Sequence, residues 1–257
     1  MKKGQMKKSI KAIFLFITVF ALLPFVLSCK EKPDVKIKCF ESNSVVITNN
    51  NTAVVIDASC SDLEDIQKFL ESNNTEFISA LIISCYTEDT LNAASSLSVS
   101  NDALNIYVPS QSFEGSAYNN FMDACDELSV EPCSVEGSVS FGAAELSVRV
   151  YAPLEDMSKS LITRIVCNKA SMLFCSFADD ERITEFVEYD TNNYDLIKLP
   201  VNSDDFDSVE TLIDTAKPDI VIADPASKNN TALKRAEVYV SDKALSFKCN
   251  GKKISKE

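Results

Sequence analysis

The sequence contains no histidine among its 257 residues, and it contains no tryptophan. Histidine is the commonest proton shuttle and the commonest metal ligand in proteins. Its absence excludes serine–histidine and cysteine–histidine catalysis, and it excludes zinc sites built on imidazole. Glycine and proline are also scarce, with 5 and 8 residues. Their scarcity excludes collagen-like, linker-rich and low-complexity chains, so we expect a globular protein.

Positive charge is scarce beyond the amino terminus. The whole chain carries 25 Lys and Arg against 38 Asp and Glu, and five of the lysines lie in residues 1–28, which hold no acid. Residues 29–257 therefore carry a net charge of −18. A surface of this sign repels nucleic acid and anionic lipid, so a nucleic-acid partner is disfavoured. Simple solubility is the alternative explanation of the charge.

The amino terminus is typical of a bacterial export signal. Five lysines precede residues 12–27, an almost wholly apolar run of 16 residues, which is shorter than the roughly 20 that a membrane-spanning helix needs. The run ends at Val26-Leu27-Ser28-Cys29, which resembles a lipoprotein cleavage box. We expect residues 1–28 to be a signal peptide, Cys29 to carry lipid (palmitate), and residues 29–34 to form a tether. The protein would then be exported and held by its lipid at the outer face of the cell membrane. A plain membrane anchor is the alternative.

Eight further cysteines follow Cys29. An even number in an exported chain favours disulfides. A domain of this size does not need them for stability, and a cysteine in an apolar run behaves as a small hydrophobic residue. The sequence leaves both states open for these residues: Cys39, Cys60, Cys85, Cys125, Cys133, Cys167, Cys175 and Cys249.

Strand-like runs and helical periodicity alternate through residues 35–257. Residues 44–48 and 53–57 predict two strands joined by a hairpin turn at residues 49–52. Ser61 and Glu64 have the spacing of a capping box at the start of a helix. The pattern predicts one α/β domain, a four-layer αββα sandwich of two facing mixed β-sheets with outer helices.

The order of these runs resembles the metallo-β-lactamase fold, and within it the soluble hydrolase-like domain of the competence (DNA-uptake) channel protein family. Residues 53–58 resemble the family's early strand, which ends in an Asp, and residues 80–84 resemble the strand before its first metal motif. Residues 173–176 and 196–200 resemble the strands before the later metal ligands, and residues 237–242 resemble its closing hairpin. The resemblance covers nearly all of residues 35–251.

The metal motifs of that family are lost in this sequence. The family has His-x-His-x-Asp-His where this chain reads Cys85-Tyr86-Thr87-Glu88-Asp89-Thr90, so only the Asp remains. The resemblance places the later ligand positions at Phe177 and at Val201-Asn202. One carboxylate cannot hold a zinc ion, so the resemblance implies a family member without a catalytic centre and without a cofactor. The degenerate positions are Cys85, Thr87, Asp89, Thr90, Phe177, Val201 and Asn202.

Several side chains near these positions allow alternatives. Cys85, Asp89 and Cys175 are the strongest replacement ligands for a metal, although two of them also suit a buried apolar role. The acidic clusters at residues 88–89 and 179–181 are expected to begin helices. Asp57 is expected to accept hydrogen bonds from backbone amides of the next loop. Phe177 and Tyr86 are expected to fill the vacated pocket.

The sequence is compatible with three functions. The first is a non-catalytic binding or interaction protein at the cell surface, whose protein partner the sequence does not reveal. The second is a metal-dependent hydrolase of phosphodiesterase or nuclease type that uses carboxylate or thiolate ligands. The third is a solute-binding lipoprotein, which needs a pocket of roughly 300 Å³ or more.

Overall fold

The computed structural model describes residues 33–154, 160–201, 203, 206–225 and 231–257. The expected signal peptide, the lipidation residue Cys29 and the degenerate position Asn202 lie outside these residues. Pro33–Glu257 forms one unit with its own cores. Among the described residues, no helix is long and apolar enough to cross a membrane.

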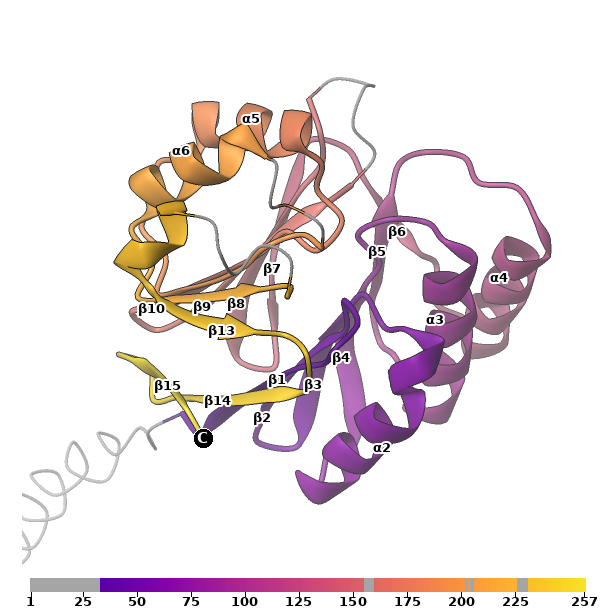
Figure 1. The fold of residues 1–257 in the computed structure, drawn as a ribbon. Coiled ribbons are helices and arrows are strands. Elements are labelled where there is room, and N and C mark those ends of the chain that lie inside the picture. Colours follow the sequence, from indigo (N-terminus) through magenta and orange to yellow (C-terminus); the bar gives the residue numbers. More distant parts are fainter. Residues whose placement is uncertain (1–32, 155–159, 202, 204–205, 226–230) are drawn as a thin grey trace, which may run out of the picture. The chain divides into compact units, whose positions relative to one another are not determined.

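Sheet A has eight strands and contains both ends of the described chain (Figure 1). Its strand order is β15-β14-β1-β2-β3-β4-β5-β6. Antiparallel pairing joins β15 through to β3, and parallel pairing joins β3 through to β6. The bounds are β1 (Val35–Cys39), β2 (Val45–Asn49), β3 (Thr52–Ile56), β4 (Phe77–Ile82), β5 (Ile106–Pro109), β6 (Cys133–Val135), β14 (Leu245–Cys249) and β15 (Ile254–Lys256).

Sheet B has seven strands in the order β13-β12-β11-β10-β9-β8-β7. Antiparallel pairing joins β7 through to β10, and parallel pairing joins β10 through to β13. Both sheets are therefore mixed. The bounds are β7 (Ser138–Ala143), β8 (Leu146–Tyr151), β9 (Ile162–Cys167), β10 (Ala170–Phe174), β11 (Leu196–Lys198), β12 (Ile220–Ala223) and β13 (Glu237–Val240).

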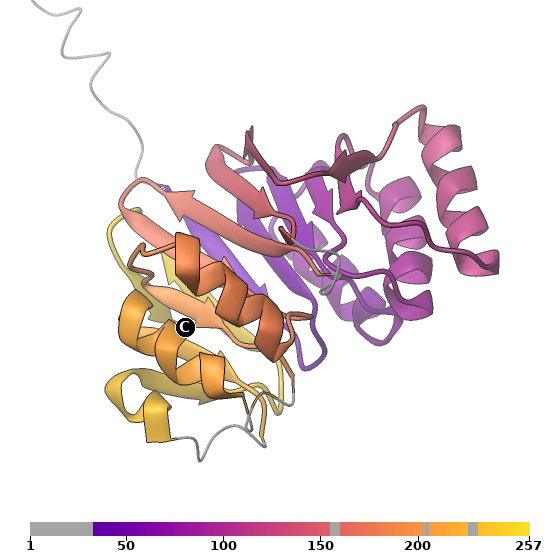
Figure 2. The same ribbon diagram turned by 90° about the horizontal axis from the view of Figure 1, so that it is seen from above.

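Three apolar cores hold the layers together. Alternate residues of β1, such as Ile37, face the core between the sheets, where Val148 and Val150 of β8 also lie. A second core joins sheet A to α2, α3 and α4, and a third joins sheet B to α5 and α6 (Figures 1 and 2). The predicted αββα sandwich is confirmed. The helices are α2 (Leu63–Ser72), α3 (Glu88–Ser100), α4 (Ser116–Leu128), α5 (Asp180–Tyr189) and α6 (Asp207–Ala216), with the short turns η1 (Cys60–Asp62) and η3 (Thr231–Arg235).

Of three local predictions made from the sequence, the structure confirms one and contradicts two. The hairpin turn is confirmed, because Asn50 and Asn51 join β2 to β3 and Asn50 has φ 54°. The capping box at Ser61 is wrong: Ser59 caps η1 by accepting from the Ser61 amide. The closing hairpin is also wrong, because β13 pairs in sheet B whereas β14 pairs in sheet A. A hydrophobic pattern marks a strand but does not say which sheet receives it.

Candidate functional site

The loops that carry the degenerate positions follow the carboxyl ends of β4, β10 and β11. Two contacts bring the sheets together at this end of the sandwich. The Leu161 amide of the sheet B side donates to the Ser84 carbonyl at 2.8 Å. The Ser176 hydroxyl donates to the Asn43 carbonyl, which follows β1, at 3.5 Å. The resemblance places the family's metal site at this same end.

A buried lysine lies between the sheets here. Lys198 ends β11, and only 2% of it is exposed. Its Nζ donates to Asn43 Oδ1 at 3.2 Å, across to sheet A, and to Ser176 Oγ at 3.3 Å. Burial lowers the pKa of Lys198, while the thiols of Cys39 and Cys175 and the carboxyl of Asp57 act to raise it. The amino group of Lys198 therefore occupies a low-dielectric position beside two thiols and one carboxyl group.

Asp57 is the buried carboxyl that faces this lysine. It follows β3 in a left-handed conformation with φ 51°, and its Oδ1 accepts from the Ser84 amide at 2.6 Å. This bond confirms the expectation for Asp57. Its Oδ2 is buried and has no hydrogen-bond partner among the described residues. Burial raises the pKa of Asp57 to about 7, although Ser84 and the Lys198 charge act to lower it.

Two of the degenerate positions serve a helix terminus. The Thr87 hydroxyl accepts from the Thr90 amide at 3.0 Å, and the Thr90 hydroxyl accepts from the Thr87 amide at 3.0 Å. This reciprocal pair is the capping box of α3. The Thr90 hydroxyl also donates to the Cys85 carbonyl at 3.0 Å. Both hydroxyls are therefore committed to the local backbone.

Asp89, the one residue of the family's first metal motif that this chain keeps, lies apart from the buried Lys198 and Asp57. Asp89 is exposed in the first turn of α3, and its Oδ1 accepts from the Cys60 amide at 3.1 Å. Cys85 is half-buried, and its thiol faces the Tyr86 carbonyl at 3.9 Å. Cys175 is fully buried, and burial raises its pKa to about 12 against the charges of Arg182 and Lys198. Asp89 thus lies at the surface, whereas Cys175 lies beside Lys198.

The prediction that Tyr86 fills the vacated metal pocket is wrong. Tyr86 packs against Phe113 and Tyr118 with ring centroids 5.7 Å away in each case, and its hydroxyl donates to the Pro109 carbonyl. Its ring therefore belongs to the core under α4. Phe177 is half-buried, and Val201 is 42% exposed.

The acidic cluster at residues 179–181 begins α5, as expected. The Asp179 side chain accepts from the Arg182 amide at 2.8 Å. Arg182 itself is fully buried, and it donates to the Ser160 and Tyr151 carbonyls at 3.1 and 3.0 Å. The arginine therefore joins α5 to the strand ends of sheet B. Sequence reasoning missed both Arg182 and Lys198.

The donor set does not fit the metal centre of the resembled family. A zinc site needs three or more nitrogen, sulfur or carboxylate ligands that converge on one point. Within the described ranges, no group of three or more Cys, Asp or Glu side chains could hold a metal ion. The ammonium of Lys198 would also repel a divalent cation in this buried position. We therefore derive no chemical step through a metal.

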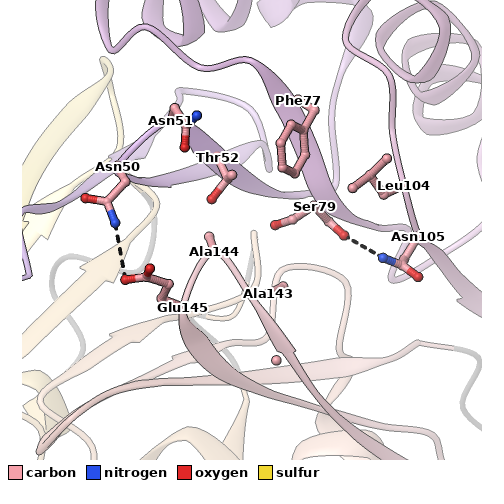
Figure 3. A pocket seen from close by; sticks show the side chains of 11 residues that line it. Asn50, Asn51, Thr52, Phe77, Ser79, Leu104, Asn105, Ala143, Ala144 and Glu145 are labelled. Carbon is pink, nitrogen blue, oxygen red and sulfur yellow. Dashed lines mark hydrogen bonds between the residues drawn. The ribbon is translucent and has the colours of Figure 1, made fainter.

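A pocket lies at the opposite end of the sandwich from Lys198 (Figure 3). Thr52 and Phe77, which begin β3 and β4, line it, so it lies away from Asp57 at the other end of β3. Its volume is about 340 Å³, above the size that a solute-binding protein needs. Asn50 Nδ2 donates to Glu145 Oε2 at 3.2 Å across its mouth, which ties the β2–β3 turn to the β7–β8 turn. Its other lining residues are Asn51, Ser79, Leu104, Asn105, Gly142, Ala143 and Ala144.

Comparison with known proteins gave similarity in structure alone. No protein-family model and no curated protein sequence matches the chain. The metallo-β-lactamase fold protein YhfI from Bacillus subtilis is similar with a TM-score of 0.61 and 11% identity, over 84% of this chain and 100% of that one. Igni18, a metallo hydrolase from Ignicoccus hospitalis, has a TM-score of 0.55 and 11% identity, over 83% and 98%. A metal-dependent hydrolase from Parabacteroides distasonis has a TM-score of 0.54 and 11% identity, over 81% and 93%. Two facing mixed sheets with outer helices, shared with these structures, show that this chain has the metallo-β-lactamase fold.

Proposed function

We propose that this chain is a non-catalytic metallo-β-lactamase-fold protein that binds a partner at the outer face of the cell membrane. The observation that carries the proposal is the buried ammonium of Lys198, held by Asn43 and Ser176. It places a hydrogen-bond donor at the end of the sandwich where the resemblance places metal ions. An ammonium group has no open coordination position, so it cannot activate water as a metal ion does.

The neighbouring side chains support the same conclusion. Thr87 and Thr90 cap α3, and Asp89 accepts from the Cys60 amide at the surface. These groups stabilise the local backbone, and in the part of the chain that the structure describes no three Cys, Asp or Glu side chains could hold a metal ion together. The domain keeps the fold of a hydrolase, but the end of the sandwich that would hold the metal is packed around Lys198. Its strongly acidic surface makes nucleic acid a poor partner.

Metal content and turnover test the non-catalytic proposal. The purified full chain would be stripped with a chelator, dialysed against Zn²⁺, Mn²⁺ or Mg²⁺, and assayed for bound metal. Hydrolysis of a phosphodiester and of a β-lactam would be measured on the same samples. We expect less than 0.1 metal ion per chain, as an order-of-magnitude bound, and rates equal to buffer. Asp89→Ala is expected to behave like the wild type, because the exposed Asp89 side chain accepts a hydrogen bond from the Cys60 amide of η1 at the surface.

The opposite result has a clear meaning. One bound metal ion per chain, with turnover that Asp89→Ala abolishes, would overturn the proposal. It would favour a hydrolase with carboxylate or thiolate ligands instead.

Lipid attachment at Cys29 is tested separately. Cells that express the chain would be labelled with radioactive palmitate, and the processed size would be measured by mass spectrometry. We expect Cys29→Ser to lose both the label and the cleavage before residue 29. Cys60→Ser, which alters an exposed cysteine of the folded domain, is the matched control and should keep both. Continued labelling of Cys29→Ser would reject the anchor.

A further inference from the structure

Two cysteines from different sheets meet at one edge of the central core. Cys167 ends β9 of sheet B, and Cys249 ends β14 of sheet A. Both side chains belong to the core between the sheets, and they are 3% and 1% exposed. The thiols of Cys167 and Cys249 interact with each other, and this interaction shifts the pKa of both. The two cysteines are therefore neighbours across the interface between the sheets.

The main chain fixes this neighbourhood independently of the thiols. After Cys167 the chain turns through Asn168, which has φ 53°, and the next amide, that of Lys169, donates to the Gly251 carbonyl at 2.9 Å. Gly251 has φ 80°, and a Cβ atom at this position would lie 2.7 Å from Asn168 Nδ2. Only glycine allows the two turns to approach this closely. The turns after β9 and β14 thus hold the two cysteines close to each other.

The surroundings favour a thiolate on one member of the pair. The Gly251 amide donates to Cys249 Sγ at 3.4 Å. The Cys167 thiol and, after it, this bond lower the pKa of Cys249 against the effect of burial, whereas the same pair interaction raises the pKa of Cys167. Burial raises the pKa of Cys39 and Cys175 to about 12. Because the thiolate is the reactive form, the lowered pKa makes Cys249 the better nucleophile of the pair, while the other two buried thiols stay protonated.

We propose that Cys167 and Cys249 are a redox site that closes a disulfide bond between the two sheets. The bond would join β9, which lies between β8 and β10 in sheet B, to β14, which lies between β1 and β15 in sheet A. The inference does not depend on the proposed function, since it concerns only the covalent state of the folded domain.

The oxidant is a disulfide, either a small molecule such as oxidised glutathione or the active-site disulfide of an oxidoreductase. The Cys249 thiolate attacks one sulfur of the oxidant, forms a mixed disulfide and expels the other sulfur as a thiolate. Cys167 then loses its proton, and its sulfur attacks the Cys249 sulfur and expels the remaining half of the oxidant. The chain loses two electrons and two protons, and the oxidant leaves as two thiols.

Peptide mapping of the full wild-type chain tests the pairing directly. The detergent-solubilised protein would be incubated at pH 8 with oxidised glutathione or with a phosphine reductant, and free thiols would be blocked with iodoacetamide. Trypsin releases residues 165–169 and residues 249–252, and each of these peptides contains one cysteine. We expect the two peptides to be linked in the oxidised sample and to be separate after reduction.

Thermal unfolding gives a second readout. The bond closes a loop of residues 167–249, so oxidation is expected to raise the midpoint of unfolding by roughly 10 °C. The double variant Cys167→Ala/Cys249→Ala should lose this dependence on oxidant, whereas Cys125→Ala, another buried cysteine, should keep it. The peptide map needs no variant, so it decides the question even where a variant fails to fold. Two separately alkylated peptides in the oxidised sample, or a link to any other cysteine, would overturn the proposal.

Discussion

The change Asp57→Asn isolates the buried carboxyl that faces Lys198. Asn tolerates the left-handed backbone at this position, where φ is 51°. Its side-chain oxygen can still accept from the Ser84 amide, which Asp57 Oδ1 binds at 2.6 Å. Its amide group replaces Oδ2, the oxygen without a hydrogen-bond partner among the described residues. The substitution therefore removes a titratable proton and changes little else.

The pKa of Asp57 determines the size and sign of the effect. It rises from the ordinary aspartate value of 3.8 to about 7 in the folded protein. The native state therefore binds this proton more tightly than the unfolded state does, so the free energy of unfolding is highest at low pH and falls as pH rises through 4–7. With these two pKa values, linkage gives a loss of about 2.5 kcal/mol between pH 5 and pH 8. Asp57→Asn should abolish that loss, so its free energy of unfolding should not fall between pH 5 and pH 8.

Urea unfolding of both proteins, followed by circular dichroism at pH 5, 6, 7 and 8, measures the difference. Asp89→Asn changes an exposed carboxylate and serves as the control, which should keep the wild-type slope. Lys198 contributes with the opposite sign, because its lowered pKa makes stability rise with pH through its own titration. Because Asp57→Asn removes a charge that raises the pKa of Lys198, this contribution grows in the variant and adds to the expected difference in slope. Equal slopes for Asp57→Asn and the wild type would refute the assignment of a proton to Asp57 in the folded state.

Further substitutions test the same structure. Lys198→Met should lower the free energy of unfolding by about 1–3 kcal/mol at pH 8, because Asn43 Oδ1 and Ser176 Oγ lose their donor and the Asp57 carboxylate loses a nearby positive charge. The cost should shrink at pH 5, where Asp57 is protonated, and an equal cost at both pH values in denaturant titrations would contradict the interaction between Lys198 and Asp57. Gly137→Ala should cost about 1–2 kcal/mol, since its φ of 73° is left-handed but nothing lies within 4 Å of the new Cβ. Gly251→Ala should cost roughly 1–3 kcal/mol more, because its Cβ would also clash with Asn168, and equal melting temperatures for the two variants would reject that contact.

The layered fold could be predicted because most of its strands are short apolar runs between turn residues. β2 and β3 are visible in this way, and the Asn pair between them marks their turn. β7 escaped prediction because it lies at a sheet edge, where Ser138–Ala143 alternates exposed and half-buried side chains and contains Gly142. A strand that buries little apolar surface leaves little hydrophobic signal.

The candidate site was predictable only where its chemistry is local. Asp57 follows an apolar strand, so its bond to a neighbouring loop could be anticipated. Lys198 could not, because lysine is seldom fully buried and its partner Asn43 lies 155 positions away. Its one visible signal is its place inside the apolar run of residues 196–199. The approach of Cys167 to Cys249 likewise depends on which sheet receives β14, and no local pattern contains that information.

The place of β1 has a consequence for the time at which this protein can fold. β1 is the first described strand, yet it lies between β2 and β14, whose residues 245–249 follow it by more than 200 positions in the chain. Until they emerge from the ribosome, one edge of β1 presents unpaired amides and carbonyls and sheet A remains incomplete. Pairing over so long a stretch of chain is slow, because a large loop must close first. Sheet A can therefore be completed only after residues 245–249 have been synthesised, so the antiparallel half of this sheet forms later than the position of β1 in the chain suggests.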